Sequence, residues 1–320
     1  MKRTSAVFTI LCCLLVYYLW LHAAPVHAHP VSATELDAGR INWISLKFKA
    51  KSFFATVEND IELKNIAATE VEKFLIASPT GKVLNGSGPD LFCVVVSSVI
   101  EPITGGSEYI LSQAWYDPKP ATVLQRVRLR QGQEKWQKTY RFTDRGVFRM
   151  RKKPKSPDEA AMSVEHWTDS EGSFYAYGTH NDGCLPVLEP SILLYIASVI
   201  DPDGEEQPLS FYVFNKKQLH QVQMHRAGVN RIKVDFRAKS GEREVRRKEE
   251  IQALKLAFKT RSLAEPNEEP EPFSFLGLQG DFDLYIDKAS RIPIQVSGKI
   301  SKFGKVDIRL QKAELRRVEK

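Results

Sequence analysis

The stretch LYIDKASRIPIQVSGKI, residues 284–300, places a proline inside a segment that otherwise has the pattern of a β-strand. Ile292, Ile294 and Val296 lie on one face and polar residues on the other, which is the period of two expected of a half-buried strand. Pro293 has no N–H to donate to a neighbouring strand. We therefore expect this strand at the edge of a sheet or next to a β-bulge.

The same alternation recurs on at least eight segments separated by turn residues, so β structure is expected to dominate. The clearest exception is EPSILLYIASVID, residues 189–201, whose apolar residues do not alternate. Pro190 near its start and Pro202 after its end predict a helix of about three turns. We expect a mainly β protein whose incurved antiparallel sheet forms an incomplete β-barrel, with one or two packed helices and one of them near the mouth.

Two neighbouring segments suggest a sheet with one apolar, aromatic side and one hydrated side. In residues 122–131 Val127 alternates with Arg126 and Arg128, and in residues 136–142 aromatic residues alternate with polar ones. A strongly curved sheet encloses more space than its own side chains fill, so its aromatic residues either line a cavity or simply form the core. The candidates for the cavity lining are Phe48, Phe54, Trp115, Trp136, Tyr140 and Phe142.

The first 28 residues have the pattern of a signal peptide. Lys2 and Arg3 precede an apolar run over residues 7–24, and small residues follow up to Ala28. We expect residues 29–320 to form a single domain in the periplasm of a Gram-negative type of cell. An uncleaved inner-membrane anchor formed by residues 7–24 is the alternative.

Removal of residues 1–28 would leave 44 basic and 39 acidic side chains, a net charge of +5. The basic residues are spread along the chain, and export separates the protein from nucleic acid, so no nucleic-acid partner is expected. Contact with a membrane is expected only through the leader or through weak attraction to anionic head groups.

Cys93 and Cys184 are the cysteines that remain beyond the leader. In an oxidising compartment such a pair is often bridged, which would stabilise the fold by roughly 4 kcal/mol. The alternative is that Cys93, within the apolar LFCVVV, is a buried residue with no partner.

The sequence predicts no metal, no cofactor and no enzymatic activity, because none of the common catalytic or phosphate-binding motifs occurs in it. His220 and His225 are five residues apart, a poor spacing for shared metal ligation. His180 and Cys184 lie in the turn-like HNDGC and are the candidates for a hydrolase site, although we expect HNDGC to be an ordinary turn.

Two loops stand out by their composition. Residues 261–273 contain SLAEPNEEPEP, an acidic proline-rich insert that predicts a mobile loop with no core of its own. Residues 151–157 form a charged, proline-containing stretch. Both loops are candidate contacts for protein partners.

The closing segment, residues 281–315, resembles the end of an exported bacterial family known as domain of unknown function 3108. The likeness lies in a strand, an Asp-containing turn at Asp287, the step Arg291-Ile292-Pro293 and a final hairpin with Gly304. Residues 189–215 are similar to that family's central helix, turn and strand. The similarity covers about residues 40–315, and it departs from the pattern at Ala197 and in the length of the acidic insert.

That family looks like a distant relative of the LolA and LolB lipoprotein carriers, whose incomplete barrel holds lipid chains. The resemblance therefore implies a non-enzymatic periplasmic binding protein for an apolar or lipidic envelope component. The alternatives are an envelope assembly factor that binds protein partners and, third, an envelope hydrolase. In the turn, Asp287 and Arg291 either form an exposed ion pair or are simply polar turn residues.

Overall fold

The computed structural model describes residues 29–30, 36–51, 55–178, 186–200, 208–300 and 304–316. The predicted leader, Phe54, His180 and Cys184 lie outside these ranges. The strands are β1 (His29–Pro30), β2 (Trp43–Lys51), β3 (Ala55–Ala67), β4 (Asp90–Pro102), β5 (Glu108–Asp117), β6 (Thr122–Gln131), β7 (Trp136–Phe142), β8 (Gly146–Lys153), β9 (Asp169–Ala176), β10 (Val187–Leu188), β11 (Leu209–Asn215), β12 (Gln218–Ser240), β13 (Arg243–Ser262), β14 (Ser274–Phe275), β15 (Leu278–Asp287), β16 (Pro293–Ile300) and β17 (Gly304–Leu315). The helices are η2 (Ala38–Arg40), α2 (Ala68–Glu72), α3 (Pro157–Ala161), η3 (Val164–His166) and α4 (Ile192–Val199).

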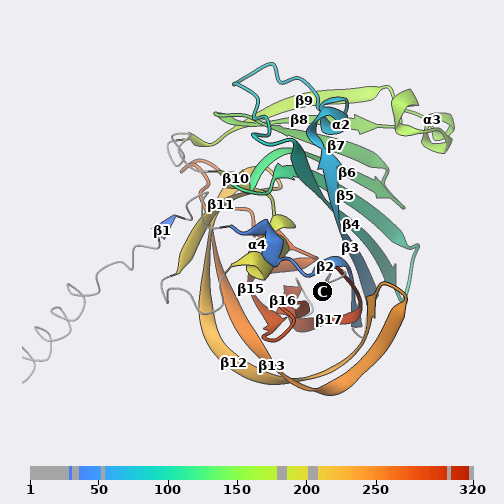
Figure 1. Ribbon diagram of the computed structural model, residues 1–320. Helices are drawn as coiled ribbons and strands as arrows, with labels where there is room; N and C mark the ends of the chain where they lie inside the picture. The colour runs from blue at the N-terminus through green and yellow to red at the C-terminus, as the bar shows by residue number, and fades with distance from the viewer. Residues whose placement is uncertain are drawn as a thin grey trace, which may run out of the picture.

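The strands belong to one large curved sheet that does not close into a barrel (Figure 1). Along the sheet, β17 pairs with β2 and so joins the C-terminal strands to the run from β2 to β9, whose neighbours are all antiparallel. The other end of the order is formed by β1, β10 and β11. The prediction of a mainly β, incurved and incomplete barrel is confirmed.

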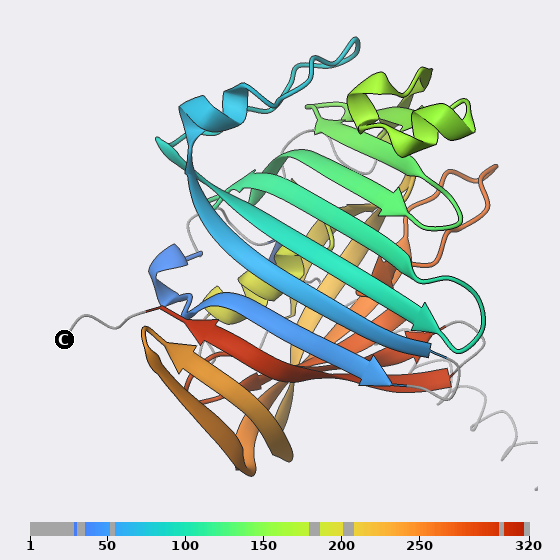
Figure 2. The ribbon, with the colours of Figure 1, turned by 90° about the vertical axis from the view of Figure 1, so that its right-hand side faces the viewer.

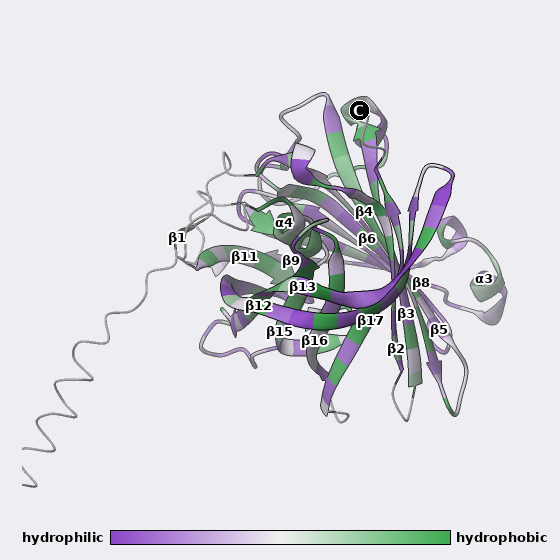
Figure 3. Cartoon of the chain, turned by 60° about the horizontal axis from the view of Figure 1, so that its bottom comes forward, coloured by the Kyte–Doolittle hydropathy of each residue, from purple (hydrophilic) through white to green (hydrophobic). Residues whose placement is uncertain are grey.

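The long hairpin of β12 and β13 reaches beyond the rest of the sheet (Figure 2). Its far part turns back, because Arg237–Ser240 of β12 pair in parallel with Lys312–Leu315 of β17. Hydrophilic residues dominate the far part of β13 in Figure 3, and residues 243–250 there are exposed or half-buried.

Helix α4 lies inside the curve of the sheet (Figure 1), and all eight of its side chains are buried. A helix that is apolar on every side must be surrounded by protein, and the absence of alternation in its sequence reflects this position. Tyr195 packs edge-on against Tyr116 and Phe92, with ring centroids 5.3 and 5.8 Å apart. The predicted helix exists, but it spans about two turns and fills the interior instead of lying near the mouth.

Polar contacts hold the C-terminal half of α4. The indole N–H of Trp43 donates to Ser198 Oγ at 3.0 Å. The guanidinium of Arg291 donates to the backbone oxygens of Ser198, at 3.2 Å, and of Ile200. The last carbonyls of a helix have no partner within the helix, and a cation near them is also favoured by the helix dipole. Arg291 therefore completes the C-terminal end of this buried helix.

Pro293 is the first residue of β16, a position that tolerates the missing N–H. Tyr285 pairs with Gln295 and Ile286 with Pro293, which leaves Ile294 as an extra residue and forms a β-bulge. The bulge was one of the two expected settings. The other expected setting, an edge strand, was wrong, because β16 lies between β15 and β17 and is buried on both faces.

The two predicted loops are more ordered in their contacts than their composition suggests. The stretch at 151–157 is divided between the end of β8 and the start of α3. In the acidic insert, Glu271 forms an ion pair with Lys216 at 2.9 Å, and Gln218 bonds to the backbone of Glu269 and Glu271. Phe273, at the end of the insert, is 2% exposed and belongs to the core. Mobility of the first half of the insert stays a prediction.

If α4 fills the interior, Ile196→Ala is expected to lower the free energy of unfolding by about 2–5 kcal/mol, because it leaves a cavity in a fully buried site. Ile103→Ala makes the same chemical change at a side chain that is 69% exposed and should cost less than about 0.5 kcal/mol. Urea unfolding measures both variants. Equal losses would contradict the buried position of α4.

Candidate functional site

A pocket of about 260 Å³ remains on the concave face where α4 does not reach. It lies between the inner face of β3–β6 and the chain around β11 and β14. Its lining residues are Val57, Asn59, Val96, Ser98, Ile100, Ile110, Ser112, Arg126, Arg128, Pro190, Ser191, Asn215, Lys216, Ser274, Phe275, Leu276 and Gly277. Small side chains such as Ser98 and Ser112 on the inner face leave this space unfilled.

The pocket has an apolar wall and a polar wall. Val57, Val96, Ile100 and Ile110 form the apolar wall on β3–β5, and Phe275 faces them from β14. On the polar side, serine, asparagine and arginine side chains line the same space. A pocket with both kinds of wall is suited to a molecule that has an apolar part and a polar part.

The polar wall continues into a strongly basic inner surface on β6, β7 and β8. Arg128 is opposite Lys138, which is opposite Arg151, and in the next row Arg126 is opposite Tyr140, which is opposite Arg149. Residues opposite each other on neighbouring strands point to the same face. The side of β6 that carries its arginines is therefore the inner side, together with the aromatic residues of β7.

This arrangement corrects the predicted faces. Val127 belongs to a second apolar cluster with Cys93, Trp115 and Leu124 on the convex face of the sheet. The apolar sides of β6 and β7 thus point in opposite directions. Arg141, on the convex side, is 2% exposed because the chain after α2 covers it, and it donates to the backbone oxygens of Ile76 and Leu124.

A buried carboxylate lies beneath the basic surface. Glu189, just before α4, is fully buried, and its Oε2 lies 3.2 Å from Arg126 Nε. This contact brings the charges together without the angle of a hydrogen bond, and the same Nε donates to Ser112 Oγ at 3.0 Å. Burial raises the pKa of Glu189, while the nearby Arg126 and Arg128 oppose that rise. Arg126, which lines the pocket, therefore has a carboxylate beneath it that offsets its charge.

The aromatic residues predicted to line the cavity are divided between two faces. Phe48 and Phe142 are fully buried core residues. Trp136 and Tyr140 lie on the inner face beside the cations, outside the lining of the 260 Å³ pocket. Trp115 lies on the convex face, where its ring stacks 6.5 Å from that of Phe74. Apart from Phe275, the pocket itself is lined by aliphatic and polar residues, which period-two patterns on single strands do not distinguish from ordinary core.

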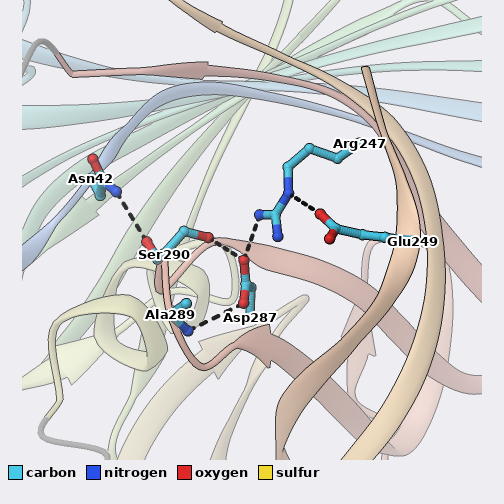
Figure 4. Close-up of polar contacts among 6 residues, drawn as sticks. All are labelled: Asn42, Arg247, Glu249, Asp287, Ala289 and Ser290. Atoms are coloured by element: carbon cyan, nitrogen blue, oxygen red, sulfur yellow. Dashed lines mark hydrogen bonds and ion pairs between the residues drawn. The ribbon is translucent and has the colours of Figure 1, made fainter. Parts of the chain in front are cut away.

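The side chains of Asp287 and Arg291 do not form an ion pair with each other, although the backbone N–H of Arg291 donates to the carbonyl oxygen of Asp287 at 2.7 Å. Asp287 is 2% exposed and accepts from Arg247 Nη1 on β13 at 2.7 Å, from Ser290 Oγ at 2.5 Å and from the backbone N–H of Ala289 (Figure 4). Arg291 turns the other way, to the end of α4. These residues join the hairpin, the turn and the helix, so their part in the protein is structural.

Comparison with known proteins finds a likeness to a solved structure of unknown function. No family model matches the sequence, and no curated protein matches it. A beta-barrel-like protein of domain of unknown function DUF1849 from Brucella abortus has a TM-score of 0.43 and 5% identity to this chain. The match covers 86% of this chain and 98% of that one. The resemblance of residues 281–315 to domain of unknown function 3108 stays a prediction.

Two other hollows lie away from the pocket. A groove of about 520 Å³ on the convex face is lined by Phe74, Cys93 and Trp115 among others. A space of about 770 Å³ lies between the β12–β13 hairpin and β16–β17, with residues of both charges around it, such as Asp235, Arg246 and Arg309. Among the residues that the structure describes, no helix is long and apolar enough to cross a membrane.

Cys93 is buried and its thiol is free. Burial raises its pKa to about 12, so the reactive thiolate is scarce at neutral pH. The structure thus shows Cys93 as the buried residue with no partner that was the alternative to a disulfide, and Cys184 lies outside the described residues.

With Cys12, Cys13 and Cys184 changed to Ser, Cys93 is expected to resist iodoacetamide at pH 8 in the folded protein and to react fully in urea. Mass spectrometry counts the adducts, and the same protein with Cys93→Ser corrects for other sites. Rapid labelling of the folded protein would contradict the buried position.

His220 is a histidine buried in the core. Within the described ranges no group of three or more His, Cys, Asp or Glu side chains could hold a metal ion. His220 is 1% exposed, neither ring nitrogen has a hydrogen-bond partner among the described residues, and its ring lies edge-on to Phe273 at 5.4 Å. Burial lowers its pKa from 6.5 to about 4.

The lowered pKa means that the neutral form of His220 is favoured in the fold. Above pH 6.5 this has no pH-dependent effect, whereas from pH 6.5 down to about 4 the unfolded chain takes up a proton that the folded chain does not. The free energy of unfolding should therefore fall by up to about 1.4 kcal/mol per pH unit in that window. His220→Phe removes this contribution. Urea titrations should therefore show that the free energy of unfolding of the variant rises relative to that of wild type as the pH falls. A difference in the free energy of unfolding between the two proteins that does not change with pH would contradict the lowered pKa of His220.

Proposed function

We propose that this chain is an exported, non-enzymatic protein that binds an apolar or lipidic component of the cell envelope in the concave face of its sheet. The observation that carries the proposal is the 260 Å³ pocket with one apolar and one polar wall. Export rests on the predicted leader over residues 1–28.

The size of the pocket limits which ligands can bind. Pockets that hold drug-sized molecules measure about 300–1,000 Å³, and this one lies just below that range. Helix α4 fills the space that a carrier of several acyl chains would need. The pocket therefore favours an amphiphile with a single chain over a lipid anchor with several chains.

The two walls suggest how such a ligand would lie. The chain would contact Val57, Val96 and Ile110, and its head would face the serines and arginines. Burial of each CH₂ group is worth about 0.8 kcal/mol, so a few methylenes would give measurable affinity. The polar head would keep the arginine side of the pocket solvated or paired, which an entirely apolar ligand would not.

The first test measures binding of a nonionic single-chain probe, dodecyl maltoside below its micelle concentration, by isothermal titration calorimetry. Wild type is expected to bind at one site. Ile110→Trp fills the pocket and should weaken binding at least tenfold. Leu111→Trp places the same bulk on the opposite face of the same strand and should leave binding unchanged.

Absence of binding by wild type, or equal weakening in both variants, would contradict the proposal. Organic extraction of the exported protein gives an independent readout, because a co-purifying single-chain lipid is expected.

An assembly factor that binds protein partners is a second candidate. The observation that favours it is the convex groove, where Phe74 is 60% exposed over Trp115. It predicts a specific co-purifying envelope protein that is lost in Phe74→Ser and kept in Ile110→Trp.

A further inference from the structure

The inner surface of β6–β8 carries more positive charge than the described residues neutralise. Arg126 faces Glu189 at 3.2 Å. Arg149 and Arg151 both contact Glu171, the former at 3.4 Å. Each of these arginines thus has a carboxylate within reach.

Arg128 and Lys138 are different. Among the residues that the structure describes, no carboxylate forms an ion pair with either one, although they stand directly opposite each other on β6 and β7. Like charges that face each other across strands are destabilising. Arg128 Nε is also buried without a hydrogen-bond partner. Two adjacent cations are thus held together at a cost to the fold.

Trp136 holds the two cations in place. Lys138 Nζ lies 4.3 Å and Arg128 Cζ 5.7 Å from the centre of its ring, both within cation–π range. The ring offsets part of the charge but offers no hydrogen-bond acceptor. Burial and the neighbouring cations lower the pKa of Lys138 to about 8, and burial lowers the pKa of Arg128 to about 10. An anion placed here would relieve both effects.

The pair is also continuous with the pocket. Arg128 lines the 260 Å³ space together with Ser98, Ser112 and Ile110. A head group bound to Arg128 and Lys138 can therefore belong to a molecule whose chain lies against the apolar wall. Arginine offers planar paired donors for an oxyanion, and lysine adds a point charge.

We propose that Arg128 and Lys138, held against Trp136, bind the anionic oxygen-bearing head group of the ligand, a phosphate, sulfate or carboxylate. This inference rests on the proposed function and deepens it, since it names the ligand as a single-chain anionic amphiphile. The chain supplies affinity and the anion fixes its direction in the pocket.

The experiment compares two probes with the same chain, dodecyl phosphate and dodecyl maltoside, both below their micelle concentrations, in isothermal titration calorimetry. Wild type is expected to bind dodecyl phosphate at least tenfold more tightly. Arg128→Gln and Lys138→Gln should each lose about tenfold for the phosphate, which is what one charge-assisted hydrogen bond is worth, and less than twofold for the maltoside.

Arg130→Gln is the matched control. It removes the same charge from the same strand and face, but Arg130 is already paired with Glu108 at 2.8 Å and with Glu134. Its phosphate affinity should stay within about twofold of wild type. Because the two surplus cations repel each other, Arg128→Gln should not lower the urea midpoint, which separates loss of binding from loss of folding.

Inorganic phosphate forms a third arm. It is expected to compete with dodecyl phosphate only weakly, at millimolar concentration, since it lacks the chain. Equal affinity of wild type for the two dodecyl probes, or a loss in Arg130→Gln as large as in Arg128→Gln, would overturn the anion site while leaving the binding pocket intact. If inorganic phosphate binds as tightly as dodecyl phosphate, the claim that the ligand is an amphiphile would be overturned. Failure of both dodecyl probes to bind would instead refute the proposed function.

Discussion

A helix enclosed by a sheet can exist only if its terminal backbone groups find partners other than water, and this requirement organises the protein around α4. The carbonyls at its C-terminal end are reached by Arg291. Arg291 adopts a left-handed conformation, with φ of 60°, at the end of the turn that Asp287 stabilises. Asp287 in turn binds Arg247 on the long hairpin. One chain of contacts therefore connects the hairpin, the β15–β16 turn, the helix and, through Ser198, Trp43 on β2.

The space that α4 leaves empty follows from the residues of the facing strands. Where the inner face carries large side chains, such as Tyr116 and Phe92, they pack on the helix. Where it carries Ser98 and Ser112, nothing fills the gap, and the arginines of β6 border it. The same curvature that encloses the helix turns these arginines inward, where Arg128, which has no ion-pair partner among the described residues, is costly unless something anionic meets it.

The sequence predicts the fold class because alternation is a local property: each strand shows its own period of two, and an apolar stretch without alternation, residues 189–201, predicts a helix. That this helix is enclosed by the sheet was not predicted. The sequence also does not say which of two faces points inward. On β6 the arginine side lies inside, because its register with β7 places Arg126 beside Tyr140, and a register between strands is not written in either strand alone.

The sequence also did not predict which distant residues individual side chains contact. Asp287 and Arg291 are four residues apart, a spacing that suggests a local ion pair. Asp287 instead forms its ion pair with Arg247, 40 positions away. Pro293 correctly indicated an irregularity in β16 but not that another strand would cover each side. In each case the deciding neighbour comes from a distant part of the chain, as expected of a fold dominated by long-range strand pairing.

The central claim, that the concave face holds one amphiphile beside α4, is tested most directly by a crystal structure of the protein with a dodecyl phosphate brominated at its terminal carbon. Anomalous scattering locates the bromine without assumption about the pose. The account predicts one bromine peak among Val57, Ile110 and Phe275, with the phosphate toward Arg128. A peak in the convex groove beside Phe74, with none on the concave face, would contradict it.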